Sequence, residues 1–238
     1  PQPPLAGRDL DHVYEMDYER DQHPFYEQKG RVKALETIRF SLTTHRGCFG
    51  GCAFCSIAPH QGRIVSSRSE SSVIKEAEHL TRHPLFKGII PDVGGPTANM
   101  YAMSCEKAAT KGMCRNRACL FPDVCNNMKA DHNKQIDLLR RLRKIPGVRK
   151  IFVASGIRHD LILADKDNGE RYLKELVMHH ISGQMKIAPE HTQDDVLNYM
   201  GKPGSKVLLA FRDMFDKLNK VAGKKQFLTY YLIAAHPG

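Results

Sequence analysis

The feature that most constrains this chain is a group of three cysteines at the spacing C-x3-C-x2-C. They are Cys48, Cys52 and Cys55, and the intervening Gly50 and Gly51 let the backbone turn tightly around a bulky group. Three thiolates are one fewer than a closed zinc site, or a cluster with four cysteine ligands, would use. A four-iron cube held by this loop would keep one iron without a protein ligand, and such an open position is where metal centres do chemistry. A zinc knuckle and an apolar cluster of buried thiols are the alternatives at this point.

Longer motifs around these cysteines resemble a known family. Phe54 completes the pattern C-x3-C-x-aromatic-C, which resembles the signature of the radical S-adenosylmethionine (SAM) superfamily. Residues 46–56, 62–70, 92–101 and 186–192 resemble the YgiQ-type (UPF0313) proteins of that superfamily. The resemblance implies a [4Fe–4S] cluster on Cys48, Cys52 and Cys55, with SAM on the open iron. It also implies reductive cleavage of SAM to methionine and a 5′-deoxyadenosyl radical, and it leaves the substrate unknown.

The same resemblance points to residues that contact SAM. A Gly-Gly-Glu-like segment meets the methionine ammonium group in the superfamily, and here the segment reads Gly94-Gly95-Pro96-Thr97. Because proline replaces the acid, we expect backbone carbonyls to receive the ammonium group. The remaining predicted contacts stand at strand ends, where parallel α/β folds place their chemistry. They are Ser155, Arg158, Lys186, which would face a cofactor carboxylate, and Glu190, which would face a ribose hydroxyl. For Lys186 and Glu190, an exposed strand end is the alternative.

A second group of cysteines lies in a polar, basic stretch at residues 103–133, which we call the cysteine-rich excursion. A loop of this length without a core of its own needs either a stabilising cross-link, such as a bound metal, or a function. Four thiolates could hold an auxiliary iron–sulfur cluster or a structural zinc, and the number of ligands does not distinguish the two. Buried thiols without a metal are the remaining alternative. The four are Cys105, Cys114, Cys119 and Cys125.

Strand and helix patterns alternate about five times between residues 37 and 238, which predicts an α/β fold with parallel strands. The strands are expected at 37–43, 88–95, 148–155, 184–191 and 226–236, with a break at Pro91. Together with the resemblance, this predicts a partial TIM-like barrel of the (β/α)6 radical SAM type, truncated near its fifth strand. Residues 1–36 are expected to form a lead-in arm that packs over the barrel.

Length and composition bear on the domain size, on membrane spans and on the cellular compartment. The chain has 238 residues, enough for one large domain, and no apolar run approaches the ~20 residues of a membrane span. The cysteine spacing favours metal ligation in a reducing cytoplasm over disulfides. The sequence begins with Pro1 and ends at Gly238, directly after an apolar run, so we expect further segments of a longer protein on both sides.

The partners follow from this chemistry and from the charge. A radical SAM enzyme would need an external electron donor of the flavodoxin or ferredoxin kind. The net charge of +10 suits an anionic partner such as RNA, although the basic runs are short and scattered. One alternative is therefore a radical SAM modifier of RNA or protein that transfers a methyl or methylthio group with a second cluster. The other is a non-catalytic binding module braced by zinc.

Overall fold

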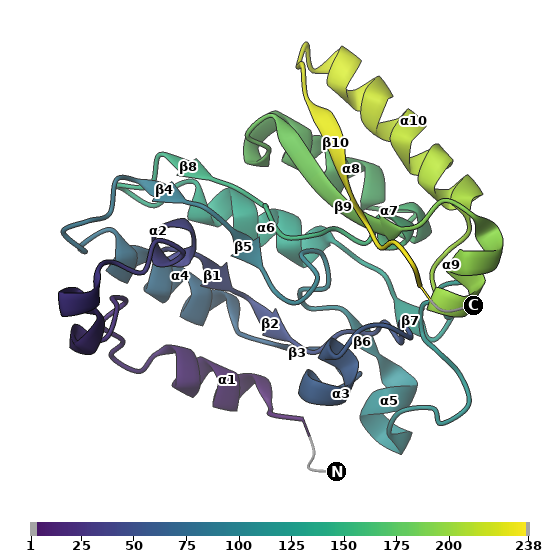
Figure 1. Cartoon of the computed structure of the whole chain (residues 1–238), viewed down its shortest axis with the longest axis horizontal. Coiled ribbons are helices and arrows are strands. Elements are labelled where there is room, and N and C mark those ends of the chain that lie inside the picture. The colour runs from purple at the N-terminus through teal and green to yellow at the C-terminus, as the bar shows by residue number, and fades with distance from the viewer. Residues whose placement is uncertain (1–3, 237–238) are drawn as a thin grey trace.

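The computed structural model describes residues 4–236 as an α/β fold of short parallel strands joined by helices (Figure 1). Three strand pairs are parallel: β1 (Leu42–Thr43) with β5 (Val93–Gly94), β4 (Ile89–Ile90) with β8 (Lys150–Ile151), and β9 (Gln184–Glu190) with β10 (Phe227–Leu232). A parallel bridge between Ile157 and Ile187 connects the segment after β8 to β9. The predicted class, with parallel strands, is confirmed.

Helices follow the strands and contact one another in sequence order. They are α4 (Glu70–Leu80), α6 (Asn133–Leu142), α7 (His159–Ala164), α8 (Gly169–Glu175) with the π-helical turn η2 (Leu176–His180), α9 (Asp194–Met200) and α10 (Ser205–Val221). Contacts run from α4 to α6, from α6 to α8 and from α8 to α10, and Figure 1 shows α10 running beside β10. The main core lies between these helices and the strands, with Tyr172, Phe211 and Phe215 among its largest buried side chains.

The predicted break at Pro91 is confirmed, and the strand predicted at 37–43 is wrong in part. The strand breaks around Pro91, since β4 ends at Ile90 and β5 begins at Val93. The Ser69 hydroxyl accepts a hydrogen bond from the Ser72 amide at 3.2 Å and caps α4. The strand predicted at 37–43 is only β1, because Leu35–Ile38 form the short helix α2. The N-cap residue of α9 is Gln193, and it makes no side-chain capping bond.

The arm before β1 packs against α4. It contains α1 (Gly7–Tyr14) and the 3-10 helix η1 (Pro24–Lys29), and the boundary predicted after residue 36 falls inside α2. Asp11 of α1 accepts a hydrogen bond from the Ser69 amide at 2.9 Å, and the Arg68 guanidinium lies 4.4 Å from the centre of the Tyr14 ring. The side chain of Leu10 is buried beneath the helix.

Two small antiparallel pairs build the end of the molecule that carries the cysteines. They are β2 (His45–Arg46) with β3 (Ser66–Ser67), and β6 (Ser104–Cys105) with β7 (Met128–Lys129). The helix α3 (Ile57–Gln61) follows the first cysteine group, and α5 (Glu106–Lys111) lies inside the cysteine-rich excursion. Among the helices of residues 4–236, none combines the length and the hydropathy that a bilayer crossing requires.

Candidate functional site

The three-cysteine segment, residues 47–56, forms a loop directly after β2, and we call it the cysteine loop. Gly47 starts it with a φ of +84°, a conformation that favours glycine. A Cβ atom at Gly47 would lie 2.1 Å from the Ile64 carbonyl oxygen, so the loop is pressed against the returning chain. The Cys48 amide donates to the carbonyl oxygen of Gly62 at 3.2 Å, and this hydrogen bond also holds the cysteine loop against the returning chain.

Gly47→Ala is therefore expected to destabilise the protein much more than Gly62→Ala does. Both glycines have a positive φ, so each alanine brings about 1–3 kcal/mol of backbone strain. At Gly62, however, a Cβ meets nothing within 4 Å, whereas at Gly47 it collides with the backbone. Urea unfolding of the two variants measures the difference. Equal losses would show that the cysteine loop is not held against residues 62–64.

Cys48 and Cys52 approach each other around Gly50. A Cβ atom at Gly50 would lie 3.2 Å from the sulfur of Cys48 and 3.7 Å from the sulfur of Cys52, so a side chain here would fill the space between the two thiols. The Gly50 amide donates to the Cys48 sulfur at 3.3 Å. A turn follows in which the Cys55 amide donates to the Cys52 carbonyl oxygen at 3.1 Å. Cys48 is buried, and Cys52 and Cys55 are half-buried.

These contacts fit an iron–sulfur cluster. The donors are thiols, a glycine leaves room between two of them, and an amide donates to a sulfur, as is common around such clusters. Burial raises the pKa of the Cys48 thiol, although the Gly50 amide, the Thr97 hydroxyl and the Arg158 charge all favour the thiolate. A bound metal would deprotonate such a thiol.

Four of the predicted SAM contacts line one open cavity of about 200 Å³: Gly94, Gly95, Pro96 and Ser155. Arg46 and Asp92 line it as well and give it both signs of charge, which suits the zwitterionic methionyl group of SAM. No sequence pattern assigned a role to Asp92. Its carboxylate accepts hydrogen bonds from the hydroxyl and the amide of Ser155, so it fixes the strand end that borders the cavity.

The buried ring of His45 supports the other side of this cavity. A Cβ atom at Gly95 would lie 2.6 Å from the imidazole, so glycine is required for this close approach. The Nε2 atom lies 3.0 Å from the Thr97 carbonyl oxygen, and the Nδ1 atom lies 2.9 Å from the Thr44 hydroxyl. Burial lowers the pKa of His45 to about 4, so the ring is neutral at physiological pH.

Arg158 lies beside the cysteine loop, and it is not among the residues that line this cavity. Its Nη1 atom is 3.7 Å from the Cys52 sulfur, and its Nε atom donates to Asp160 at 2.8 Å. Asn99 accepts a hydrogen bond from the Arg158 amide at 2.8 Å. Burial opposes the charge of the guanidinium, but Asp160 and the two thiols together raise the pKa of Arg158.

Lys186 and Glu190 lie on one face of β9. Met185 and Ile187 are buried in the core, so the alternation of the strand turns Lys186 and Glu190 to the opposite face. Glu190 has a φ of +71°, and its carboxylate lies 3.7 Å from the Nζ atom of Lys202. No sequence pattern pointed to Lys202. It lies in a Gly-Lys-Pro-Gly turn and is buried, which is rare for a lysine.

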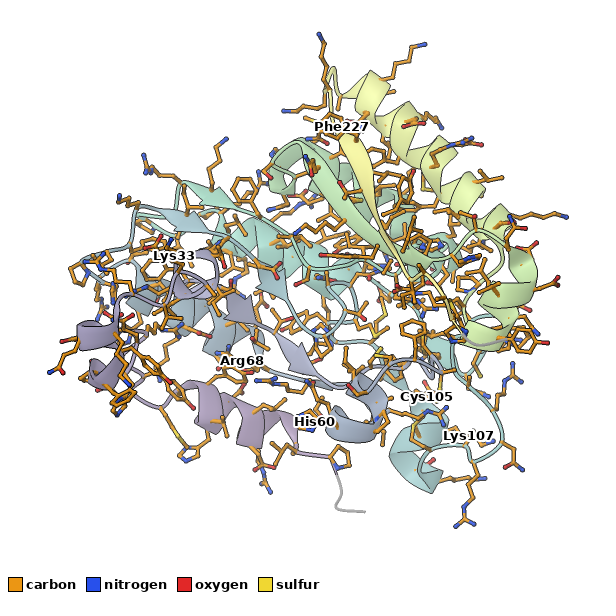
Figure 2. All side chains as sticks on the ribbon, viewed as in Figure 1. Lys33, His60, Arg68, Cys105, Lys107 and Phe227 are labelled. Atoms are coloured by element: carbon orange, nitrogen blue, oxygen red, sulfur yellow. The ribbon has the colours of Figure 1, made fainter. Side chains whose placement is uncertain are left out.

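Three of the four remaining cysteines join the apolar cluster that contains Cys48. They are Cys105, Cys119 and Cys125. Burial raises the pKa of Cys119, and the neighbouring Cys105 and Cys125 add to this effect, whereas Arg63 opposes it. Figure 2 shows Cys105 at the start of α5, next to the outward-pointing Lys107. Cys114 is not among the residues of this cluster, and its carbonyl oxygen accepts a hydrogen bond from the Arg63 guanidinium at 3.4 Å.

None of the seven cysteines, all within residues 4–236, forms a disulfide. In the part of the chain between residues 4 and 236, no three His, Cys, Asp or Glu side chains are arranged to hold one metal ion.

Comparisons with known proteins agree with these motifs. A family model described as Radical SAM N-terminal matches residues 1–41. The chain is 55% identical over 229 residues to a UPF0313 protein of Fusobacterium nucleatum, which covers 96% of this chain and 40% of that protein. It is 50% identical to a UPF0313 protein of Clostridium perfringens and 52% identical to one of Methanosarcina mazei, in each case over all 238 residues. The chain spans only 36% and 37% of these two relatives.

A solved structure also matches. It is the radical SAM methyltransferase TsrM from Kitasatospora setae, with cobalamin and a [4Fe–4S] cluster bound. The match covers 95% of this chain and 37% of that chain, with 14% sequence identity and a TM-score of 0.46. One assignment follows from the motifs, from the identity to these curated relatives along nearly the whole chain, and from the Radical SAM N-terminal match at its start. The chain belongs to the UPF0313 family of the radical SAM superfamily.

Proposed function

We propose that this chain is the catalytic part of a radical SAM enzyme, with Cys48, Cys52 and Cys55 as ligands of a [4Fe–4S] cluster. The observation that carries the proposal is the approach of the Cys48 and Cys52 sulfurs around Gly50, where a side chain would fill the space between them. The open cavity beside Gly94, Gly95 and Ser155 supports a cofactor next to this loop. When bound, the cluster supplies the electron that splits SAM into methionine and a 5′-deoxyadenosyl radical.

The protein's own residues would bind and orient the cluster and SAM. The Gly50 amide and the Thr97 hydroxyl, 3.6 Å from the Cys48 sulfur, stabilise the thiolate. Backbone carbonyls of Gly95 and Pro96 would receive the ammonium group of SAM, because the Gly94 carbonyl oxygen already accepts from the Thr44 amide and hydroxyl. The neutral His45 ring keeps this segment in place. Lys186 and Glu190 would meet the cofactor's carboxylate and ribose from β9. We further propose that the parallel units belong to a (β/α)6 barrel, since each parallel strand pair described in residues 4–236 joins neighbouring units of the chain.

For the cysteine-rich excursion we propose a second iron–sulfur cluster. Cys105, Cys119 and Cys125 share one apolar cluster with Cys48, and Arg63 beside Cys119 would stabilise thiolates. Cys114 would be the fourth ligand. An external flavodoxin- or ferredoxin-like protein would supply the electrons.

Anaerobic reconstitution of the full-length protein tests both assignments. We expect iron and sulfide for two clusters, and release of 5′-deoxyadenosine from SAM when dithionite is added. Cys119→Ser is expected to lose one cluster's iron and to keep SAM cleavage. Zinc in place of iron, together with no cleavage, would contradict the enzyme assignment and support a zinc-braced binding module. Full iron content in Cys119→Ser would contradict the second cluster.

RNA is the substrate class that the charge favours. The chain carries a net charge of +10, and Lys107, Lys111, Arg115 and Arg117 are exposed around the second group of cysteines. If these residues contact phosphates, the affinity for RNA will fall steeply as salt rises. Binding that is insensitive to salt, or absent, would favour a protein or a small molecule instead.

A further inference from the structure

We propose that Arg158 and Lys202 form a pair of buried cations that raises the reduction potential of the cluster on the cysteine loop. This inference rests on the proposed function, and it gives Arg158 a different role from the SAM contact that the resemblance implies. The two side chains come from separate parts of the chain. Arg158 follows β8, and Lys202 follows α9.

Arg158 is held so that one edge of its guanidinium faces the thiol. Asp160 occupies the Nε and Nη2 atoms, and this leaves Nη1 to point at the Cys52 sulfur, 3.7 Å away. Both side chains of the ion pair are about 5–6% exposed. The pair is therefore a fixed dipole whose positive end faces Cys52 in a region that excludes most water.

Lys202 reaches the same region from the turn after α9. Its side chain is only 3% exposed, and its Nζ atom donates to the Ala188 carbonyl oxygen. The turn itself packs against the cysteine loop. The Met200 carbonyl oxygen accepts from the Ala53 amide at 3.0 Å, and a Cβ atom at Gly201 would lie 3.8 Å from the Cys52 Cα atom.

Fixed positive charge favours the reduced state of a cluster. With three thiolate ligands, the cluster becomes more negative by one charge when it accepts one electron. Nearby cations and N–H donors to sulfur stabilise that added charge, and the effect is strong where water is scarce. Asp160 pairs with Arg158, and Glu190 pairs with Lys202. The two carboxylates hold the cations in position and partly offset their electrostatic effect on the cluster. The step is a one-electron transfer from a reductant such as dithionite, and no bond is made or broken.

A redox titration monitored by electron paramagnetic resonance tests this inference in the reconstituted full-length protein, with dithionite as reductant. Arg158→Gln and Lys202→Met remove one charge each, Arg158→Lys keeps the charge, and Lys206→Met removes an exposed charge four positions from Lys202. The signal of the site-differentiated cluster is identified by its change when SAM is added.

We expect Arg158→Gln and Lys202→Met to lower the equilibrium constant for reduction about tenfold each, which is about 59 mV toward more negative potential for one electron. Arg158→Lys and Lys206→Met should stay near the wild-type potential. Circular dichroism verifies the fold of each variant. If Arg158→Gln does not fold, Lys202→Met against Lys206→Met decides the question. An intact cluster with unchanged potential in Lys202→Met overturns the inference, whereas a wild type that binds no cluster overturns the proposed function.

Discussion

Replacing Cys48, Cys52 and Cys55 together by alanine is expected to reduce SAM cleavage to the background of dithionite alone. Alanine cannot bind iron, so the cube would lose every protein ligand that we assign to it. The change also leaves the Gly50 amide and the Thr97 hydroxyl without their sulfur acceptor. The measurement is 5′-deoxyadenosine formed per protein, together with iron and acid-labile sulfide, after anaerobic reconstitution.

The second cysteine group supplies the matched control. The triple variant should keep the iron that Cys105, Cys119 and Cys125 help to hold, and Cys119→Ser should show the opposite pattern. Because Cys48 packs in the same apolar cluster as these three residues, circular dichroism must show that the triple variant is folded. SAM cleavage that survives in a folded triple variant would contradict the assignment of the catalytic cluster.

Local sequence patterns predicted the parts of this structure that depend on local chemistry. The cysteine spacing with its two glycines predicted a tight loop, and the loop closes around Gly50. Pro91 predicted a strand break because proline cannot donate to a ladder, and β4 and β5 are separated there. In β9 the alternation of a strand buries Met185 and Ile187 and turns Lys186 to the opposite face.

The errors arose where packing decides the outcome. Residues 37–43 have β-branched and aromatic side chains, but Ile38 is exposed, so no core favours a strand there and a helical turn forms instead. Lys202 could not be assigned because the Ala188 carbonyl oxygen that it contacts lies on β9, 14 positions earlier in the sequence. Arg158 and Cys52 are 106 positions apart, and no local pattern connects them. The SAM contacts at Arg158 and Glu190 stay predictions.

The second large effect is expected from Asp160→Asn, measured as the free energy of unfolding of the iron-free protein. The substitution leaves the buried Arg158 guanidinium without its counter-charge, and loss of one partner of a buried pair costs about 3–5 kcal/mol. Replacing both residues, as Arg158→Met with Asp160→Leu, removes the unpaired charge as well. The double variant should therefore be more stable than Asp160→Asn alone, with a coupling energy above about 1 kcal/mol.

Acid should weaken the same pair. Burial works to raise the pKa of Asp160, but the Arg158 charge and its hydrogen bonds lower the pKa to about 2, below the ordinary 3.8. The unfolded chain thus binds a proton at this carboxyl before the folded chain does. The pair's contribution, about 2 kcal/mol, is complete above pH 4 and is lost as the pH falls from about 4 to about 2. Urea unfolding at several pH values should show this slope in the wild type and a smaller slope in the double variant. Equal slopes would mean that the ionised Asp160 does not stabilise the folded cysteine loop region.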